Sequence, residues 1–536
     1  MLKLLKKVKF KTLFWFFFYL FIFSLLLRGS FNYLDPDLGW HLKVGQEIIE
    51  TRAVPHINHY NYTYTGNWVD HEWLSNAGLY LLYSQAGYLV VSIVFALLII
   101  FVLILLNVFA HKFWPDINPF PIILFQSLGV VASLPNFGIR IQELTLIFLL
   151  LLLLIIVYYN KNKNWHILLF LPPLMYLWSN MHASFLIGFF LMTAWLFIKI
   201  GENIGQTFKL RFFSDYSYIL KTKEIIFFAI ALMGSFLLTL VTPYRLELYS
   251  FLIKYQDSFY QSHLQEWLSQ FSFPLQYWQL FYLALVFLAF ILYIVYLKKI
   301  KKSFKISLWT IFLISLFLFL GFKSRRHIPL LFVVSFFFII DIWKHIFSNE
   351  FSVKINYKYW RLNVWLKIFL LFCLFLASLS QIVQAKLTAK PFDNFCNNYP
   401  CGAVKFLKTN LQYDSLKLFN SYNYGGYLIW VYPERKLFID GRLPQISFAE
   451  ITFLEEYYKF FDKKEDIKKK LVQYNIGLVL LSATDHDLKL KNWEKVFFSI
   501  KNEELKDHNY LRDYLSSAGN WEKIYSDSSS VIYKRK

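Results

Sequence analysis

Apolar runs of about 20 residues follow one another along the first 385 positions, separated by short polar segments. A helix needs about 20 apolar residues to cross the hydrocarbon of a bilayer, so each run is a candidate membrane span. No small-residue cleavage site follows the first run, so we expect it to remain as an anchor. The pattern predicts a polytopic α-helical membrane protein with eleven spans, near residues 10–28, 88–110, 118–135, 141–159, 164–181, 183–200, 224–242, 275–297, 304–321, 327–346 and 362–385.

Basic residues indicate which ends of these spans face the cytoplasm. Lysine-rich segments lie at the N-terminus and in alternate loops, at 160–164, 209–223, 298–305 and 358–361. Because cytoplasmic loops are enriched in Lys and Arg, the N-terminus is predicted to be cytoplasmic, and eleven crossings put everything after residue 385 outside. Much of the formal charge of +21 follows from this topology. No basic and aromatic groove points to nucleic acid as a partner.

The pattern changes near residue 390, where the apolar runs shorten and alternate with helical segments. Strand-like runs stand at 416–420, 436–440 and 476–481, a charged helix is predicted around 450–474, and WEKIY and SVIYK follow at 521–525 and 530–534. Alternation of this kind predicts an α/β domain. We therefore expect a transmembrane domain over 1–389 with a long first outer loop, 29–87, and an extracytoplasmic α/β domain over 390–536.

Two outer loops and two cysteines add detail to this plan. The first loop contains segments with helical spacing at 37–49 and 71–87, which predict juxtamembrane helices along the outer surface. The second outer loop spans 243–274. Cys396 and Cys401 lie beyond the last span, where an oxidising compartment favours a small-loop disulfide. Two unpaired thiols are the alternative.

Polar side chains suited to chemistry gather at the predicted outer ends of the spans. Inner loops hold mostly lysine, whereas these outer ends mix carboxylate, histidine, arginine and amide, a mixture typical of reaction sites. For any single residue, a solvated loop is the simpler explanation. The candidates are Asp35, Asp37, His41, Asp70, His71, Glu72, Arg140, His182, Tyr244, Arg325, Arg326 and His327.

Alternative roles exist for the most prominent candidates. Asp35 and Asp37 precede a predicted helix, so each is either a helix N-cap or a base or metal ligand, and Asp70 is open to the same capping role. Arg325 and Arg326 are either interfacial anchors or donors to a lipid phosphate. A carboxylate-rich loop opposite an arginine-rich loop, both level with outer headgroups, fits transfer of a group from a lipid phosphate.

The stretch D-P-D-x-x-W-H-L-x-x-G at 35–45, with Pro55 and HEWL at 71–74, resembles the first outer loop of GT-C superfamily glycosyltransferases. The likeness is strongest to protein-mannosyltransferase-like and aminoarabinose-transferase-like members. In those proteins an acidic residue after the first span precedes a juxtamembrane helix, with a proline about twenty positions on. Asp35 and Pro55 match this spacing, although Pro36 stands where many relatives have Glu. The segments 179–188, 242–249, 324–330 and 420–442 resemble a bacterial branch of such proteins.

The resemblance implies an inverting glycosyltransferase of the bacterial plasma membrane, moving a sugar from a polyprenyl-phosphate donor to a hydroxyl acceptor on the outer face. Asp35 matches the catalytic aspartate, and Asp37 and Glu72 are the other catalytic candidates. Arg325 and Arg326, with Arg140, are expected to stabilise the leaving phosphate. His41, Asp70, His71, His182, Tyr244 and His327 are the further substrate-binding candidates. The acceptor class is a glycan, a lipid or a protein.

The superfamily contains metal-dependent and metal-independent members. We expect no obligatory metal, and leave Mg²⁺ or Mn²⁺ open as ligands of the acidic loop residues.

Two other classes of function compete with the enzyme. A lipid or polysaccharide transporter predicts charged residues near the middle of the membrane, yet nearly all ionisable residues here stand at span ends. A non-catalytic scaffold that displays the outer domain predicts that Asp35 and the arginines are dispensable.

Overall fold

The computed structural model describes residues 10–208, 220–253, 258–299, 307–349, 364–388, 390–448, 450–462, 465–484, 488–501 and 508–536. The chain divides into two compact units. Unit 1 consists of Met1–Asn32, Ser92–Thr242 and Gln276–Leu387, and unit 2 consists of Tyr33–Val91, Pro243–Leu275 and Thr388–Lys536. The contacts therefore group both loops, 33–91 and 243–275, with the C-terminal segment, which the sequence pattern does not indicate.

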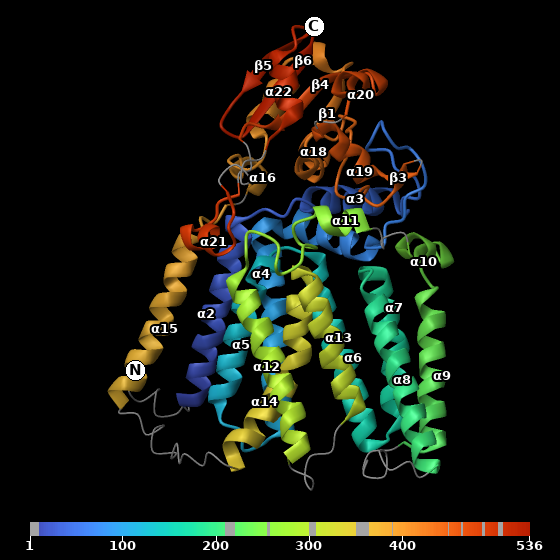
Figure 1. The fold of residues 1–536 in the computed structure, drawn as a ribbon, viewed down its shortest axis with the longest axis vertical. Helices are drawn as coiled ribbons and strands as arrows, with labels where there is room; N and C mark the ends of the chain where they lie inside the picture. Colours follow the sequence, from blue (N-terminus) through green and yellow to red (C-terminus); the bar gives the residue numbers. More distant parts are fainter. Residues whose placement is uncertain are drawn as a thin grey trace. The chain divides into compact units, whose positions relative to one another are not determined.

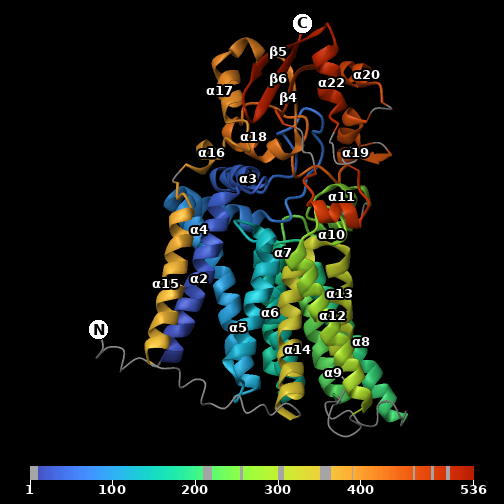
Figure 2. The same cartoon turned by 60° about the vertical axis from the view of Figure 1, so that its left-hand side comes forward.

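Unit 1 is a bundle of long helices (Figure 1). The first and last of them, α2 and α15, lie side by side in both Figure 1 and Figure 2. Small residues allow close packing elsewhere, since a Cβ on Gly129 would lie 2.1 Å from the Phe332 ring. The helices are α2 (Phe10–Asn32), the second half of α4 (Trp73–Phe113), α5 (Pro119–Ser133), α6 (Leu144–Asn162), α7 (Leu171–Met181), α8 (Phe185–Thr207), α9 (Thr222–Thr239), α12 (Tyr277–Lys299), α13 (Leu308–Lys323), α14 (Ile328–Asn349) and α15 (Val364–Gln384).

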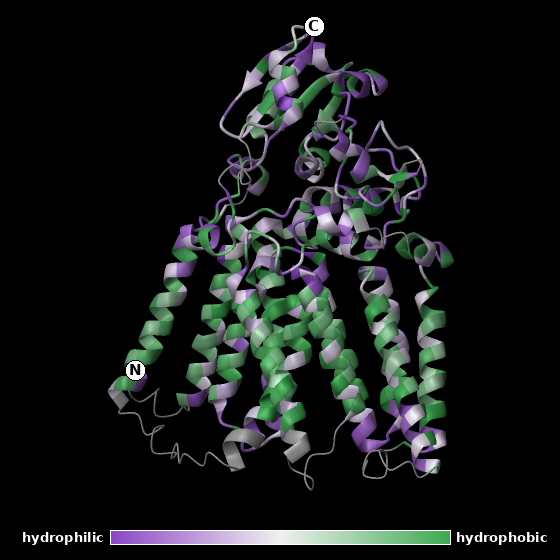
Figure 3. Cartoon of the chain, viewed as in Figure 1, coloured by the Kyte–Doolittle hydropathy of each residue, from purple (hydrophilic) through white to green (hydrophobic). Residues whose placement is uncertain are grey.

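Nine helices among the described residues are long and apolar enough to cross a membrane, and each coincides with a predicted span. Apolar colour covers most of their length in Figure 3. The two remaining predicted spans are shorter: 164–181 forms a 3₁₀ turn, Trp165–Phe170, followed by the 11 residues of α7, and 304–321 forms the 16-residue α13. The prediction of a polytopic helical membrane protein is confirmed. The lysine-rich segments 209–223, 298–305 and 358–361 lie wholly or partly outside the described residues.

Unit 2 contains a four-stranded sheet in the order β1-β4-β6-β5. Strands β1 (Lys417–Asn420) and β4 (Ile476–Ser482) are parallel, whereas β6 (Ser530–Arg535) runs antiparallel to both β4 and β5 (Trp521–Ser526). These strands confirm four of the predicted short runs, and β4 is buried along six of its seven residues because its sequence is apolar on both faces. A separate two-stranded sheet pairs β2 (Ser447–Phe448) with β3 (Ile451–Thr452).

Two predictions for this segment are wrong. Residues 436–440 do not join the sheet; instead Leu437 makes an isolated bridge with Asn61 and exchanges backbone hydrogen bonds with Tyr60 and Tyr62 of the first loop. The charged helix predicted around 450–474 is divided into α19 (Phe453–Tyr458) and α20 (Ile467–Gln473). The other helices here are α16 (Pro391–Asn394), α17 (Cys401–Thr409), α18 (Gly425–Val431), α21 (Asn492–Phe497) and α22 (Tyr510–Ser517).

Both helices predicted in the first loop are present. The first is α3, Leu38–Thr51, and the second is the beginning of α4, which runs on into the next span. A break in the helical backbone occurs at Gly87, where φ is 75°, a value that glycine adopts without the steric cost of a side chain. The second loop forms α10 (Leu246–Ile253) and α11 (Ser258–His263).

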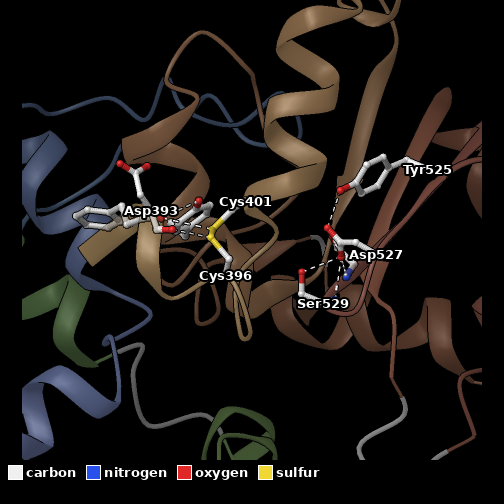
Figure 4. Close-up of a disulfide and its surroundings, with 9 residues drawn as sticks. Asp393, Cys396, Cys401, Tyr525, Asp527 and Ser529 are labelled. Atoms are coloured by element: carbon white, nitrogen blue, oxygen red, sulfur yellow. Dashed lines mark hydrogen bonds between the residues drawn. A yellow bond between two sulfur atoms is a disulfide. The ribbon is translucent and has the colours of Figure 1, made fainter. Parts of the chain in front are cut away.

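The predicted disulfide between Cys396 and Cys401 is confirmed (Figure 4). Cys401 begins α17, and the next residue, Gly402, packs against the turn between β5 and β6. A Cβ on Gly402 would lie 2.1 Å from the hydroxyl oxygen of Tyr525, which donates to Asp527 at 2.6 Å. The disulfide loop is thereby attached to the edge of the sheet.

Candidate active site

The predicted site residues belong to both units. Unit 2 holds Asp35, Asp37, His41, Asp70, His71, Glu72 and Tyr244, and unit 1 holds Arg140, His182, Arg325, Arg326 and His327.

The two aspartates of the first loop stand where the chain turns into α3. Asp37 occupies the N-cap position but makes no capping hydrogen bond with its side chain. Its Oδ1 instead accepts the indole N–H of Trp40 at 2.9 Å. Asp35 is half-buried, and its Oδ1 accepts the backbone N–H of Asp37 at 2.9 Å. The capping alternative therefore fails for the side chain of Asp37, which is committed to Trp40.

Glycines let α3 lie closely against α18 and the start of α4. A Cβ on Gly39 would lie 2.1 Å from the carbonyl oxygen of Gly426, and a Cβ on Gly45 would lie 2.1 Å from that of Asn76. Contacts this close exclude any larger residue without backbone movement. The glycines thus fix the position of α3, which carries Asp37 at its beginning and His41 one turn later.

Asn76, which the sequence analysis missed, connects Asp70 to His41. Its Nδ2 donates to both carboxylate oxygens of Asp70, at 3.0 and 2.9 Å. The amide oxygen of Asn76 must then accept from Nδ1 of His41, 2.7 Å away, so the neutral imidazole carries its proton on Nδ1. All three residues are buried. Asn76 follows Asp70 by six residues and lacks the charge that would have marked it in the sequence.

Glu72 lies between two histidines in the same cluster. Its carboxylate oxygens are 3.8 Å from Nδ1 of His41 and 3.7 Å from Nε2 of His71. Asp70 also accepts the backbone N–H of Glu72, at 3.1 Å, and because α4 begins at Trp73 this bond is not a helix cap. The structure therefore brings four predicted residues, the buried His41, Asp70 and Glu72 and the half-buried His71, into one cluster.

Burial shifts the pKa values of this cluster toward the neutral forms. Desolvation raises the pKa of Asp70 to about 6, although its hydrogen bonds from Asn76 and Glu72 act in the opposite direction. Desolvation lowers the pKa of His41 to about 3, against the hydrogen bond to Asn76. At neutral pH the cluster therefore holds an uncharged His41 beside an ionised Asp70.

Arg442 is a second buried residue that the sequence analysis missed. It forms a two-contact ion pair with Asp440, in which Nε and Nη2 donate to the two carboxylate oxygens at 2.9 Å each. The guanidinium also lies over the rings of Tyr60 and Trp68, at 4.5 and 4.8 Å from their centroids. Both partners of the pair are buried, and the Arg442 guanidinium links the 439–442 segment to the first loop through its contacts with Tyr60 and Trp68.

Tyr244 is placed by the first loop. Its hydroxyl donates to the carbonyl oxygen of Pro55 at 2.6 Å, and its ring lies 4.8 Å from that of His56. Burial, with Asp70 as a nearby negative charge, raises the pKa of Tyr244 above its ordinary range. Tyr244 thus remains a neutral hydroxyl and ties the second loop to the first.

In unit 1, the segments that carry the arginines are joined by a backbone contact. Arg325 begins the 3₁₀ turn Arg325–His327, and its carbonyl oxygen accepts from Nδ2 of Asn136 at 3.3 Å. Arg140 follows Asn136 in the same connection between α5 and α6. Arg325 is buried, whereas Arg326 and His327 are half-buried. The structure thus brings together two of the predicted phosphate-binding segments.

His182 ends α7 and faces the start of α6. Its Nδ1 accepts the backbone N–H of Ser184 at 3.1 Å and lies 3.2 Å from Oγ1 of Thr145. Because Nδ1 accepts a hydrogen bond, the neutral ring carries its proton on Nε2. His182 is therefore held as an Nε2 donor within unit 1.

No group of three or more His, Cys, Asp or Glu side chains within the described ranges is arranged to hold a metal ion. The Asp70, His71 and Glu72 cluster is held by hydrogen bonds and paired contacts instead of converging on one point.

The fold is similar to that of an archaeal enzyme of known structure. The chain resembles the crystal structure of the Archaeoglobus fulgidus oligosaccharyltransferase in the apo form, at 11% identity and a TM-score of 0.53, over 89% of this chain and 70% of the archaeal one. The chain has a GT-C fold. The same enzyme tethered to an acceptor peptide containing the NVT sequon matches at 10% identity and a TM-score of 0.51, over 97% and 74% of the two chains. Its complex with an inhibitory peptide and a dolichol-phosphate matches at 10% identity and a TM-score of 0.51, over 99% and 75%. No protein-family model matches the sequence, and no curated protein matches it.

Proposed function

We propose that the protein is a glycosyltransferase that moves a sugar from a polyprenyl-phosphate donor to an acceptor. The observation that carries the proposal is the likeness of nearly the whole chain, at TM-scores above 0.5, to an oligosaccharyltransferase that has been solved with a dolichol-phosphate. The aspartate at the start of α3 and the two arginine-bearing turns of unit 1 supply the groups that such a transfer needs.

Asp35 is proposed as the general base. Its carboxylate takes the proton of the acceptor hydroxyl while the hydroxyl oxygen attacks the anomeric carbon. The bond from that carbon to the phosphate oxygen breaks, the phosphate leaves with the electron pair, and the anomeric configuration inverts. Asp37 is the weaker candidate because its carboxylate holds Trp40, and Glu72 is weaker because it lies buried between two histidines.

Arg325 and Arg326, with Arg140, are proposed to stabilise the departing phosphate. Negative charge develops on the leaving oxygen in the transition state, where fixed cationic donors act most strongly. His182 adds a neutral Nε2–H donor in the same unit. His41, Asp70, His71, Tyr244 and His327 are proposed as substrate-side residues, with Asp70 and His41 acting through the Asn76 hydrogen bonds.

We place the reaction on the outer face of a bacterial plasma membrane, with the N-terminus in the cytoplasm and the C-terminal segment outside. The disulfide at 396–401 supports an oxidising compartment for that segment. A membrane-impermeant thiol reagent, applied to intact cells after mild reduction, is expected to label Cys396 and Cys401. Labelling only after the membrane is broken would reverse this topology.

The test of the function uses the purified chain in bilayers with a panel of polyprenyl-phosphate sugars. Two acceptor classes are supplied, glycan hydroxyls and a peptide containing Asn-Val-Thr, because the archaeal enzyme was solved with such a peptide. Release of polyprenyl phosphate that requires both donor and acceptor supports the proposal, and the anomer of the product reports inversion. A folded protein that releases no phosphate from any donor rejects it.

Metal dependence is tested in the same assay. The proposed reaction has no metal-bound step, so a chelator is expected to leave turnover unchanged. Loss of turnover with the chelator and recovery with Mg²⁺ or Mn²⁺ would require a metal at the acidic loop residues.

A further inference from the structure

Tyr399 touches the backbone immediately before Asp35. Its hydroxyl donates to the carbonyl oxygen of Leu34 at 2.9 Å, and both residues are buried. A buried carbonyl oxygen that loses its donor is costly, so this hydrogen bond holds the chain at Leu34 in place. Burial, followed by the nearby Tyr33, Asp35 and Asp37, raises the pKa of Tyr399 well above its ordinary value, so the hydroxyl remains a donor at neutral pH.

Tyr399 is itself held firmly. It lies inside the loop closed by the disulfide between Cys396 and Cys401, and that loop is attached to the sheet beside Asp527 (Figure 4). The Tyr399 ring also stacks on Tyr427 of α18, with centroids 5.0 Å apart and an interplanar angle of 23°. A short covalent loop has few alternative conformations, so the hydroxyl has a fixed position relative to α18.

Two glycines of the C-terminal segment contact the residues that follow Asp35. A Cβ on Gly426 would lie 2.1 Å from the carbonyl oxygen of Pro36, and a Cβ on Gly441 would lie 2.1 Å from Oδ1 of Asp37. Three points of the C-terminal segment therefore contact the chain at Leu34, Pro36 and Asp37. Asp35 lies in the middle of this short stretch.

We propose that the C-terminal segment positions Asp35 for the transfer, with Tyr399 as the positioning residue and the 396–401 disulfide as the element that holds it. The inference rests on the proposed function and deepens it, because it assigns the C-terminal segment a part in the reaction. A general base must lie within hydrogen-bond reach of the proton it removes, and a misplacement of about 1 Å costs on the order of 100-fold in rate. Loss of one of three contacts is expected to cost about 10-fold in kcat.

The experiment compares Tyr399→Phe with Tyr424→Phe in the donor and acceptor assay. Tyr424 is a matched control, because it is also buried and its hydroxyl donates to a backbone carbonyl oxygen, that of Ser529, at 2.9 Å. Both variants lose one such hydrogen bond, so similar shifts in the thermal unfolding midpoint are expected. Only Tyr399→Phe is expected to lower kcat by about 10-fold while the donor KM stays within about twofold, because a positioning defect acts on the transition state.

The disulfide supplies a second, independent variant. Cys396→Ser with Cys401→Ser releases the loop, and we expect it to lower kcat through the same hydrogen bond. Adding Tyr399→Phe to the serine pair should then lower kcat no further, since residues that act through one contact are not additive. A reductant should slow the native protein and leave the serine pair unaffected.

The outcomes separate this inference from the proposed function. A wild-type protein that transfers no sugar from any donor overturns the proposed function. An active wild type in which Tyr399→Phe keeps the kcat of Tyr424→Phe overturns the positioning role alone. If Tyr399→Phe does not fold, the serine pair decides: a kcat equal to that of the wild type overturns the inference.

Discussion

Two polar clusters of unit 2 are held differently from the candidate arginines of unit 1. In these clusters, buried charged groups are bonded to other side chains, as in the Asp70, Asn76 and His41 series and in the pair of Asp440 with Arg442. In unit 1 the arginines stand at helix ends in short turns, and the contact that joins two of these turns is made to the Arg325 backbone.

This difference in burial and bonding distinguishes residues that stabilise the fold from residues that act only in the reaction. A buried ion pair or hydrogen-bonded cluster contributes to folding as well as to any reaction, because removing one member leaves its partner buried without compensation. A half-buried side chain in a turn at a helix end, such as Arg326, is replaced with less loss of stability. Substitutions in the buried clusters of unit 2 should therefore change folding and chemistry together, unlike substitution of Asp35, and substitution of Arg326 in unit 1 should change substrate use alone.

Asp35→Asn is expected to have the largest effect on turnover. The amide keeps an acceptor for the backbone N–H of Asp37 but cannot take a proton, so transfer should fall by about 10²- to 10⁴-fold at little cost in stability. Single-turnover transfer and thermal unfolding are measured in parallel, with Asp116→Asn as a control at an exposed aspartate between α4 and α5. A stable Asp35→Asn variant with wild-type transfer would remove Asp35 as the base and leave Asp37 and Glu72.

Arg442→Leu is expected to have the largest effect on stability. It leaves Asp440 buried without its guanidinium partner, which should cost about 3 to 5 kcal/mol of unfolding free energy. The control is Lys534→Met, which breaks a half-exposed pair with Glu522 and should cost less than about 1 kcal/mol. Equal losses in the two variants, measured by chemical denaturation, would contradict the contrast between buried and surface charge.

Asp70 should make stability depend on pH. Its pKa rises from 3.8 to about 6 on folding. Its contribution to the free energy of unfolding is therefore present below pH 3.8 and is lost as the pH rises through about 6. Asp70→Asn removes this loss, and the free energy of unfolding of the variant, relative to that of the wild type, should rise by roughly 2 kcal/mol between pH 4 and pH 6.

His41 should act in the opposite direction over the same range. Its pKa falls from 6.5 to about 3 on folding. Its contribution to the free energy of unfolding is therefore present above pH 6.5 and is lost as the pH falls toward 3. Denaturant unfolding of Asp70→Asn, His41→Gln and the wild type at pH 4, 5 and 6 checks both slopes. A stability difference that does not change with pH would mean that neither group titrates as a buried one.

Arg326→Gln tests the arginine-bearing turns of unit 1, and it is expected to have the smallest effect of these variants. Loss of a charged hydrogen bond to the donor phosphate, worth about 1.5 to 3 kcal/mol, should raise the donor KM by about 10- to 100-fold. The unfolding midpoint should stay near that of the wild type. Lys323→Gln, at the neighbouring exposed lysine, is the control and should change KM by less than about twofold. A large loss of stability in Arg326→Gln would place this residue with the structural charges of unit 2.

Sequence reasoning predicted much of the fold because the relevant signals are local. Apolar runs of sufficient length become membrane helices wherever they occur, and nine of the predicted spans have that form among the described residues. The strands at 476–482 and 530–535 and the disulfide at 396–401 were also predicted from short segments. The strand predicted at 436–440 failed because its backbone pairs with residues 60–62, almost 380 positions earlier, instead of with the sheet.

The candidate site was predicted only in part, for the same reason. Charged and ring-bearing residues such as Asp70 and His41 stand out in a sequence, but the amide that joins them, Asn76, does not. Arg442 ends the segment 420–442, which was noted for its resemblance, but no role was assigned to it because its contacts with Tyr60 and Trp68 join segments that are far apart in the chain. Glycines such as Gly426 and Gly441 are important because other parts of the chain pack closely against them, and the sequence does not show which parts these are.

The sequence by itself determined that this chain is a multispan helical protein, roughly where most of its membrane helices lie, and that a short-stranded segment follows the last span. Each of these depends on composition within a window of about 20 residues. Only the tertiary structure decided that the first loop belongs to the same compact unit as the C-terminal segment, and that Tyr399, Gly426 and Gly441 contact the chain on both sides of Asp35. Such contacts join residues hundreds of positions apart, and they depend on the complementary shapes of packed backbones, which no local pattern records.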